Sequence, residues 1–163
     1  MTAEKPKGTA ALREMLLRSK PSDFGLAPTT DLPHVWAAMM EMQFRDATAS
    51  LVVVKGGATS LYFSTGGGVI GGETHESVRE ANRKFLAAIE RFFDAKAFVP
   101  QTSALATMKD AVTFNVLVYE GLVAARDTEE RMKTRKSPLW PLYFLGQDVI
   151  TQLRVTAEKK AGA

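Results

Sequence analysis

The clearest pattern of apolar and polar positions in the chain is a helical one, between Ser77 and Asp94. Apolar side chains recur there every three or four residues, and charged side chains, Glu90 among them, occupy the positions predicted to face solvent. Ser77 and Glu80 have the spacing of a capping box, and Thr74 offers a second N-cap. Similar spacing predicts two further helices, over residues 10–20 and 139–154.

A fourth helix is predicted after Asp31. The Asp31 side chain can cap its first turn, where Pro33 is also well suited. The apolar residues that follow are compatible with one helical face: Val35, Trp36, Met39 and Met40. We expect this face to lie in the core, because methionine fills irregular gaps well.

Short runs of β-branched and aromatic residues predict the strands. Leu51–Lys55 and Ser60–Ser64 are separated by Gly56–Gly57, a glycine pair that supplies the positive φ angles of a tight hairpin. Val112–Tyr119 alternates between apolar and other residues and predicts a third strand. The pattern over residues 122–132 fits either a strand or a helix.

This order of elements predicts an α+β fold. We expect an antiparallel sheet of two hairpins joined by a long helix and flanked by N- and C-terminal helices. The topology is similar to that of roadblock, longin and profilin folds, and topology alone does not fix function. We expect a single domain over residues 9–156, with a disordered N-terminus at 1–8 and a flexible tail at 157–163.

A glycine-rich joint, Ser64–Glu73, links the predicted hairpin to the long helix. Its Gly66-x-Gly68-x-x-Gly71 spacing is that of a dinucleotide-binding fingerprint. That fingerprint belongs between the parallel strands of a βαβ unit, whereas the strand before this joint is half of a hairpin. The joint also has P-loop spacing, but Glu73 stands where a lysine must contact phosphate, which excludes an ATPase.

Two interpretations of the joint stay open. The glycines can simply turn the chain from sheet to helix, which needs only one or two of them. Alternatively, the excess of glycine lets the backbone approach a ligand or another chain, and the helix N-terminus that follows favours an anion. In this second interpretation the ligand-binding residues are Thr65, Gly66, Gly67, Gly68, Glu73 and His75.

No catalytic residue, metal site or cofactor is predicted from the motifs. His75 and Glu76 begin like a zinc-protease motif, but Arg79 occupies the position of its second histidine. His34 is the only other histidine, so a three-histidine metal site is excluded. Ser64 lacks the preceding glycine of a nucleophile elbow.

Composition narrows the setting of the protein. The chain of 163 residues has no cysteine, which excludes disulfides and suits a reducing compartment. Met1–Gly8 is polar and leads into no apolar segment, and the apolar runs are too short to span a bilayer. We therefore expect a cytoplasmic protein. The net charge is only +3 and acidic residues interrupt the basic segment 126–136, so a nucleic-acid partner is not expected.

Two segments carry a family resemblance. Thr59–Gly72, with the sequence TSLYFSTGGGVIGG, and Ser137–Arg154, with the sequence SPLWPLYFLGQDVITQLR, resemble a family of uncharacterised bacterial proteins. The likeness extends from about Trp36 to Arg154. It implies a bacterial cytosolic origin and supplies no mechanism.

The leading hypothesis from the sequence is a non-enzymatic bacterial interaction or regulatory domain that self-associates as a homodimer. The alternative is a protein that binds a small anionic ligand, or an enzyme, with its site at the glycine-rich joint 64–76. A pocket with converging backbone N–H groups would favour the alternative, and a flat, apolar, self-paired surface would favour the leading hypothesis.

Overall fold

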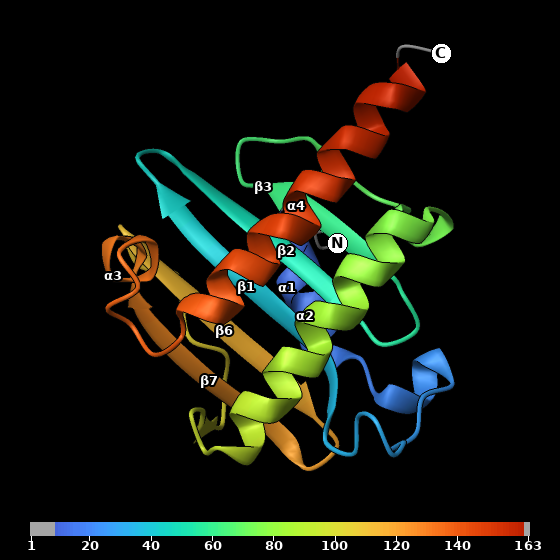
Figure 1. Ribbon diagram of the computed structural model, residues 1–163, viewed down its shortest axis with the longest axis vertical. Helices are drawn as coiled ribbons and strands as arrows, with labels where there is room; N and C mark the ends of the chain where they lie inside the picture. Colours follow the sequence, from blue (N-terminus) through green and yellow to red (C-terminus); the bar gives the residue numbers. More distant parts are fainter. Residues whose placement is uncertain (1–8, 162–163) are drawn as a thin grey trace, which may run out of the picture.

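A single antiparallel sheet with helices on both faces forms the body of the molecule (Figure 1). The computed structural model describes residues 9–161, so the expected disordered segment 1–8 lies outside the described residues. The sheet has seven strands in the order β4-β3-β2-β1-β6-β7-β5. Helices α2 and α4 cross one face, which we call the front face, and α1 lies against the back face.

The strands are β1 (Val35–Phe44), β2 (Ala47–Val54), β3 (Thr59–Phe63), β4 (Gly68–Val69), β5 (Val99–Gln101), β6 (Ala111–Val118) and β7 (Gly121–Thr128). The helices are α1 (Thr9–Arg18), α2 (Glu76–Asp94), α3 (Glu129–Lys133) and α4 (Trp140–Ala161), with two 3-10 turns, η1 (Pro21–Phe24) and η2 (Gly72–Thr74). The predicted α+β class, with hairpins joined by a long helix, is confirmed. Within residues 9–161 no helix is both long enough and apolar enough to cross a membrane.

The helix predicted after Asp31 is wrong: this segment is the strand β1, in the middle of the sheet. Every residue from Val35 to Met42 is buried, because β1 is paired on both edges and covered on both faces. Met40 faces the front core and Met39 the back one. A strand that needs apolar side chains on both faces shows no period of two, so its apolar run is compatible with a helix as well.

Both predicted hairpins are present. Strands β2 and β3 pair with Leu51 opposite Leu61, and β6 pairs with β7 with Val116 opposite Val123. The ambiguous segment 122–132 contains both of its alternatives, since β7 ends at Thr128 and the short helix α3 follows. The Thr128 hydroxyl accepts a hydrogen bond from the backbone N–H of Arg131 and caps α3.

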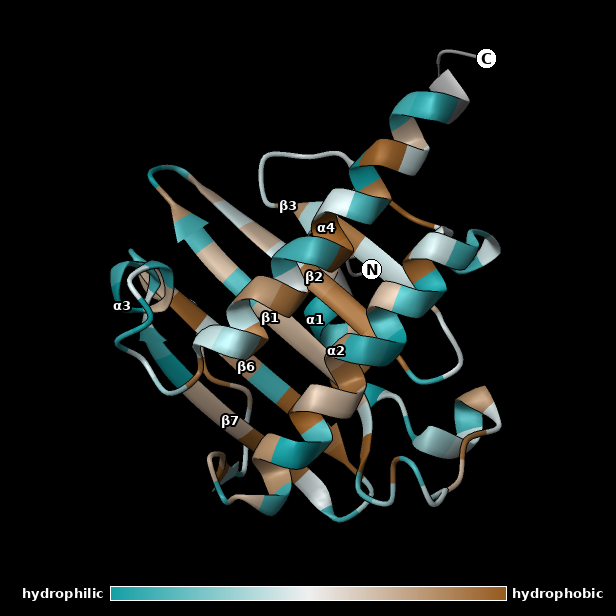
Figure 2. Cartoon of the chain, viewed as in Figure 1, coloured by the Kyte–Doolittle hydropathy of each residue, from teal (hydrophilic) through white to brown (hydrophobic). Residues whose placement is uncertain are grey.

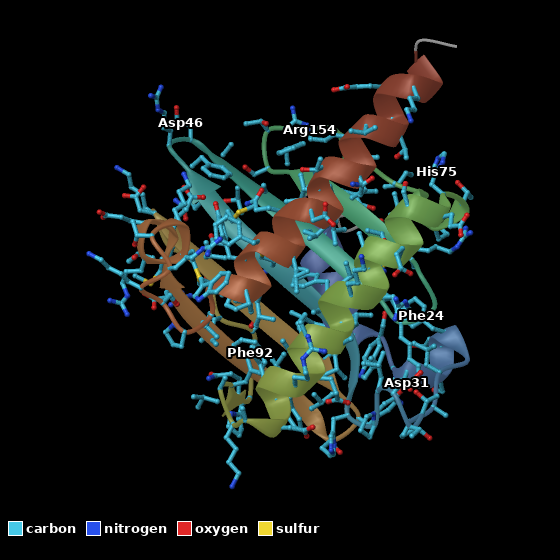
Figure 3. All side chains as sticks on the ribbon, in the orientation of Figure 1. Phe24, Asp31, Asp46, His75, Phe92 and Arg154 are labelled. Carbon is cyan, nitrogen blue, oxygen red and sulfur yellow. The ribbon has the colours of Figure 1, made fainter. Side chains whose placement is uncertain are left out.

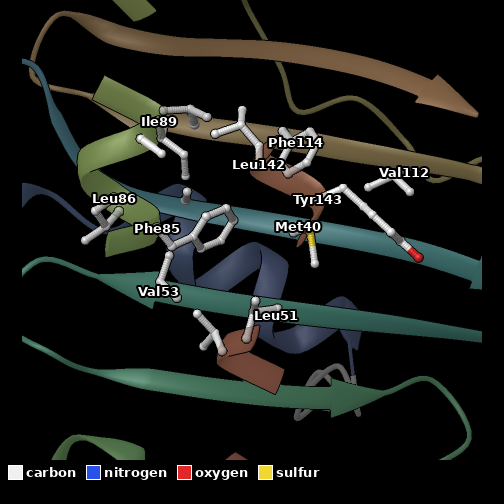
Figure 4. Close-up of a cluster of buried hydrophobic side chains, with 14 of the residues drawn as sticks. Met40, Leu51, Val53, Phe85, Leu86, Ile89, Val112, Phe114, Leu142 and Tyr143 are labelled. Carbon is white, nitrogen blue, oxygen red and sulfur yellow. The ribbon is translucent and has the colours of Figure 1, made fainter. Parts of the chain in front are cut away.

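Helix α2 packs across the front face as its pattern predicted. Phe85 and Ile89 are fully buried, and Figure 4 shows them pointing into a cluster with Met40 and Phe114 of the sheet. Hydrophilic and hydrophobic bands alternate along α2 and α4 in Figure 2, as expected of helices with one buried face. The predicted caps are wrong: α2 begins at Glu76, and His75 occupies the N-cap position without a side-chain hydrogen bond.

Helix α4 follows its prediction closely at the start and exceeds it at the end. It begins at Trp140 and continues past residue 156 to Ala161, so the first part of the expected tail is helical. Leu142, Val149 and Leu153 are fully buried against the front of the sheet and α2. This packing places α4 between the β3–β4 connection and the start of α2 (Figure 1).

The back face of the sheet has a thinner cover. Trp36, Met39 and Leu117 form an apolar cluster there with Leu16 of α1. Next to this cluster the buried Glu41 of β1 accepts a hydrogen bond from the Ser50 hydroxyl at 2.7 Å. Nε of Arg13 in α1 lies 3.3 Å from Glu41 Oε1, and burial raises the pKa of Glu41.

Candidate functional site

The glycine-rich joint forms a β-hairpin turn between β3 and β4. The N–H of Gly66 donates to the carbonyl of Phe63 at 3.0 Å, and the N–H of Phe63 donates to the carbonyl of Gly67 at 3.2 Å. Gly66 and Gly67 have φ angles of 107° and 81°, which glycine adopts without strain. Because β4 runs antiparallel to β3, the fingerprint spacing does not lie in a parallel βαβ unit.

Two further glycines of the joint, Gly68 and Gly72, are needed for close approach within the chain itself. A Cβ at Gly68 would lie 2.2 Å from the carbonyl oxygen of Leu61, the strand residue next to its partner. Gly72 is buried, and a Cβ there would lie 2.5 Å from Leu153 Cδ2 and 2.9 Å from Val78 Cγ1. Gly71, the fifth glycine, has a φ of 76°, and a Cβ there would meet no atom within 4 Å. One turn, one positive φ angle and two tight contacts thus account for the five glycines, with no ligand required.

The predicted ligand-binding residues fall into two groups. Thr65 and Gly66–Gly68 lie exposed at the β3–β4 turn, whereas Glu73 and His75 lie at the start of α2. Figure 1 shows these two places on opposite sides of α4, and Figure 3 labels His75 at the end of α2 away from the turn. His75 lines only a small hollow of about 460 Å³, together with residues at the C-terminal end of α4.

A larger groove lies along α2, between that helix, the loop 29–33 and the β2–β3 turn. We call it the α2 groove. Its volume is about 710 Å³, within the usual range for a small-molecule site. Lys55, the first residue after β2, lines the groove. The α2 side chains that line it recur at helical spacing and include Arg79, Arg83, Leu86, Glu90 and Arg91.

Two buried polar side chains of α2 fix the walls of the α2 groove. Asn82 Nδ2 donates to the Thr59 hydroxyl at 2.8 Å and to the carbonyl of Ala58 at 3.2 Å, which holds the β2–β3 turn against the helix. Glu90 Oε1 accepts the backbone N–H groups of His34 at 2.7 Å and Val35 at 3.4 Å, which holds the start of β1. Both contacts tie α2 to segments distant in the sequence.

The second carboxylate oxygen of Glu90 is the most unusual atom of the groove. Glu90 is only 5% exposed, and its Oε2 is buried with no hydrogen-bond partner among the described residues. A buried acceptor without a donor costs about 1–3 kcal/mol, and more for a charged group. Burial raises the pKa of Tyr119, and the Glu90 charge raises it further.

The hydrogen bonds of the basic side chains in the groove go to exposed side chains or to backbone carbonyl groups. Arg79 Nη1 donates to the carbonyl of Glu73 at 2.7 Å, and Lys55 Nζ donates to the Thr29 hydroxyl at 2.8 Å. Arg83 pairs with Glu80 on the surface, and this hydrogen bond lowers the pKa of Glu80. Exposed pairs of this kind contribute about 0–1 kcal/mol, so an anionic ligand can compete for these side chains.

The sequence interpretation missed this groove and misplaced one of its residues. Glu90 was predicted to face solvent with the other charges of the helix, but it is buried. The reason is that the backbone N–H groups of His34 and Val35, at the entry to the sheet, require an acceptor. The signal that could have found the groove is the spacing of Arg79, Arg83 and Glu90 along one helix face.

Neither a family model, nor a curated protein, nor a solved structure matches this chain. The resemblance to uncharacterised bacterial proteins and the likeness to roadblock, longin and profilin folds therefore stay predictions. Among residues 9–161 no group of three or more histidine, aspartate or glutamate side chains is arranged to hold a metal ion.

Substitution by alanine should lower the free energy of unfolding by different amounts at the turn glycine Gly67 and at the packed glycine Gly72. At Gly67 a Cβ meets no atom within 4 Å, so Gly67→Ala should cost only the strain of a positive φ, about 1–2 kcal/mol. Gly72→Ala should cost more, because the methyl group overlaps the buried Leu153 and Val78. Urea denaturation should give the lower midpoint for Gly72→Ala. A larger loss in Gly67→Ala would show that the turn makes a contact that this packing does not include.

Proposed function

We propose that the protein is a non-enzymatic binding domain whose ligand is a small anion-bearing molecule held in the α2 groove. The observation that carries the proposal is the set of basic side chains, Lys55, Arg79, Arg83 and Arg91, that lines one concave site of about 710 Å³. Arginine presents a planar fork of N–H donors that matches a carboxylate or a phosphate group. The groove therefore has the size and the donors of an anion site.

The structure of the β2–β3 turn supports an anion at one end of the groove. Gly57 has a φ of 110°, and a Cβ there would lie 3.1 Å from Arg79 Cγ. Glycine at this position lets the stem of Arg79 pass close to the turn, which brings its guanidinium beside the groove that Lys55 and Arg83 also line. Asp31 also lines the groove, and its negative charge raises the pKa of Arg83. A ligand anion would therefore compete with Asp31 for the Arg83 side chain.

We infer binding rather than catalysis from the chemistry of these side chains. A guanidinium group keeps its proton at physiological pH, so it holds and orients an anion but does not transfer a proton. A ligand that ties α2 to the loop 29–33 would stabilise the domain, which suits a regulatory role. A bacterial cytoplasmic setting, expected from the sequence, is part of this proposal.

Self-association, the other part of the sequence hypothesis, is supported by an exposed aromatic cluster. The Arg135 guanidinium carbon lies 4.5 Å from the centre of the Trp140 ring and 5.9 Å from that of Phe144. Phe144 is 40% exposed at the start of α4. Tryptophan and arginine are the residues that most often dominate protein interfaces. We propose that this cluster is the contact between two copies of the chain.

Anion binding predicts a charge-specific stabilisation by inorganic phosphate. Phosphate bound in the α2 groove, at about ten times its Kd, should raise the free energy of unfolding of the wild type by about 1.4 kcal/mol. Arg83→Glu should lose this contribution. Arg154→Glu is the matched control, because Arg154 is exposed on α4, away from the groove (Figure 3). Thermal unfolding with phosphate, against chloride at equal ionic strength, measures the difference.

General stabilisation by phosphate acts on both variants alike and cancels in this comparison. Equal stabilisation of Arg83→Glu and Arg154→Glu would contradict an anion site in the α2 groove.

Self-association predicts a dimer whose stability depends on Phe144. Sedimentation velocity should show a concentration-dependent dimer for the wild type and a shift towards monomer for Phe144→Ser. Val155→Ser is the control, since Val155 is similarly exposed, at 38%, further along the same helix. A monomeric wild type, or equal behaviour of the two variants, would refute the proposed contact.

A further inference from the structure

We propose that the ligand of the α2 groove is zwitterionic, with an ammonium group at Glu90 and a carboxylate at Arg83. A short peptide of about three residues with free termini is the ligand of this form that we assign to the groove. This inference rests on the proposed function and adds the chemical class of the ligand. It starts from the unpartnered Oε2 of Glu90, which anion binding alone leaves unexplained.

The two ends of the α2 groove differ in charge. Lys55, Arg79 and Arg83 outnumber the acid Asp31 at the end near the β2–β3 turn, whereas Glu90 and Asp94 outnumber the base Arg91 at the other end. Asp94 follows Glu90 by four residues and therefore lies on the same face of α2. The acidic end suits a positive group, just as the basic end suits a negative one.

Glu90 Oε2 has no hydrogen-bond partner among the described residues, and the Tyr119 hydroxyl, whose pKa the Glu90 charge raises, makes no hydrogen bond to it either. The other Glu90 oxygen, Oε1, already accepts the N–H groups of His34 and Val35. Arg91 also lines the groove, but adjacent residues of a helix do not face each other. A ligand N–H group would relieve the cost of the unpartnered oxygen, and a charged ammonium donor forms the stronger hydrogen bond with a carboxylate.

The separation of Arg83 and Glu90 along the helix axis sets the approximate length of the ligand. Glu90 follows Arg83 by seven residues, which corresponds to about 10 Å along a helix. An extended peptide advances about 3.3–3.6 Å for each residue, so three residues span this distance. Leu32, Pro33, Leu86 and Ala87 line the groove as well and offer an apolar surface to small side chains between its charged ends.

Other molecules that carry an ammonium and a carboxylate about 10 Å apart share this chemistry. A free amino acid is too short to reach both ends, and a blocked peptide lacks one of the charges. The free termini of a short peptide are therefore the features that the groove should recognise.

Three peptides test the inference by calorimetric titration of the full chain: trialanine, N-acetyl-trialanine and trialanine amide. Trialanine should bind, and loss of either terminal charge should weaken binding about tenfold or more, as expected for a charge-assisted hydrogen bond. Binding of N-acetyl-trialanine equal to that of trialanine would overturn the role of Glu90. Absence of trialanine binding would overturn the peptide as ligand.

Glu90→Gln sharpens the test, because glutamine keeps an oxygen for the N–H groups of His34 and Val35 and places an NH₂ donor where Oε2 lies. The variant should lose its preference for the free amine and favour the acetylated peptide. An unchanged preference for the free amine would overturn the assignment. Loss of the phosphate response in the wild type would instead refute the anion site itself, so the two failures are distinguishable.

Discussion

Glu90 joins helix α2 to the first strand of the sheet, and the position of the α2 groove depends on this contact. One carboxylate oxygen accepts two backbone N–H groups at the entry to β1, where the chain leaves the loop 29–33 and begins its pairing. This contact sets the distance between the helix and the loop, which form two walls of the groove. The other oxygen stays buried beside the groove without a donor. One oxygen of this side chain thus has a structural role, and the other is the one to which we assign a ligand contact.

The sheet imposes the second constraint, because β1 is paired on both edges and buried on both faces. Helices α2 and α4 cover one face with a large apolar core, and α1 covers part of the other with Leu16 and Arg13. The groove lies at the outer side of α2, where this packing ends. Leu32 and Leu86 belong both to the core and to the lining of the groove, so the apolar part of the groove is the edge of the core.

Local patterns predict helix α2 through its period and the first hairpin through its β-branched residues and the pair Gly56–Gly57, although β2 and β6 are also buried on both faces. Strand β1 has neither signal. Its run of alanine, tryptophan and methionine is equally compatible with a helix. The glycine spacing of the joint matches known ligand-binding motifs. In the structure, its glycines form a hairpin turn and allow close contacts with Leu61 and Leu153.

The α2 groove could not be predicted, because it combines three segments that are distant in the sequence: residues 29–33, 55–57 and 79–94. Each segment alone has an ordinary explanation, as a loop, a hairpin turn and the exposed side of a helix. Only the pairing of β1 with β2 and the packing of α2 bring them together. The burial of Glu90 likewise depends on the backbone donors of His34 and Val35, for which the predicted helix offers the Asp31 side chain and carbonyl as acceptors instead.

The most direct test of the account is an NMR titration that compares Gly56 and Gly57 with Gly66 and Gly67. Inorganic phosphate is added to ¹⁵N-labelled protein, with sodium chloride at equal ionic strength as the reference. The account predicts saturable shifts of the amide signals of Gly56 and Gly57, at the α2 groove, and unchanged signals for Gly66 and Gly67, at the β3–β4 turn. Saturable shifts at Gly66 and Gly67, with Gly56 and Gly57 unchanged, would contradict it and restore the glycine-rich joint as the binding site.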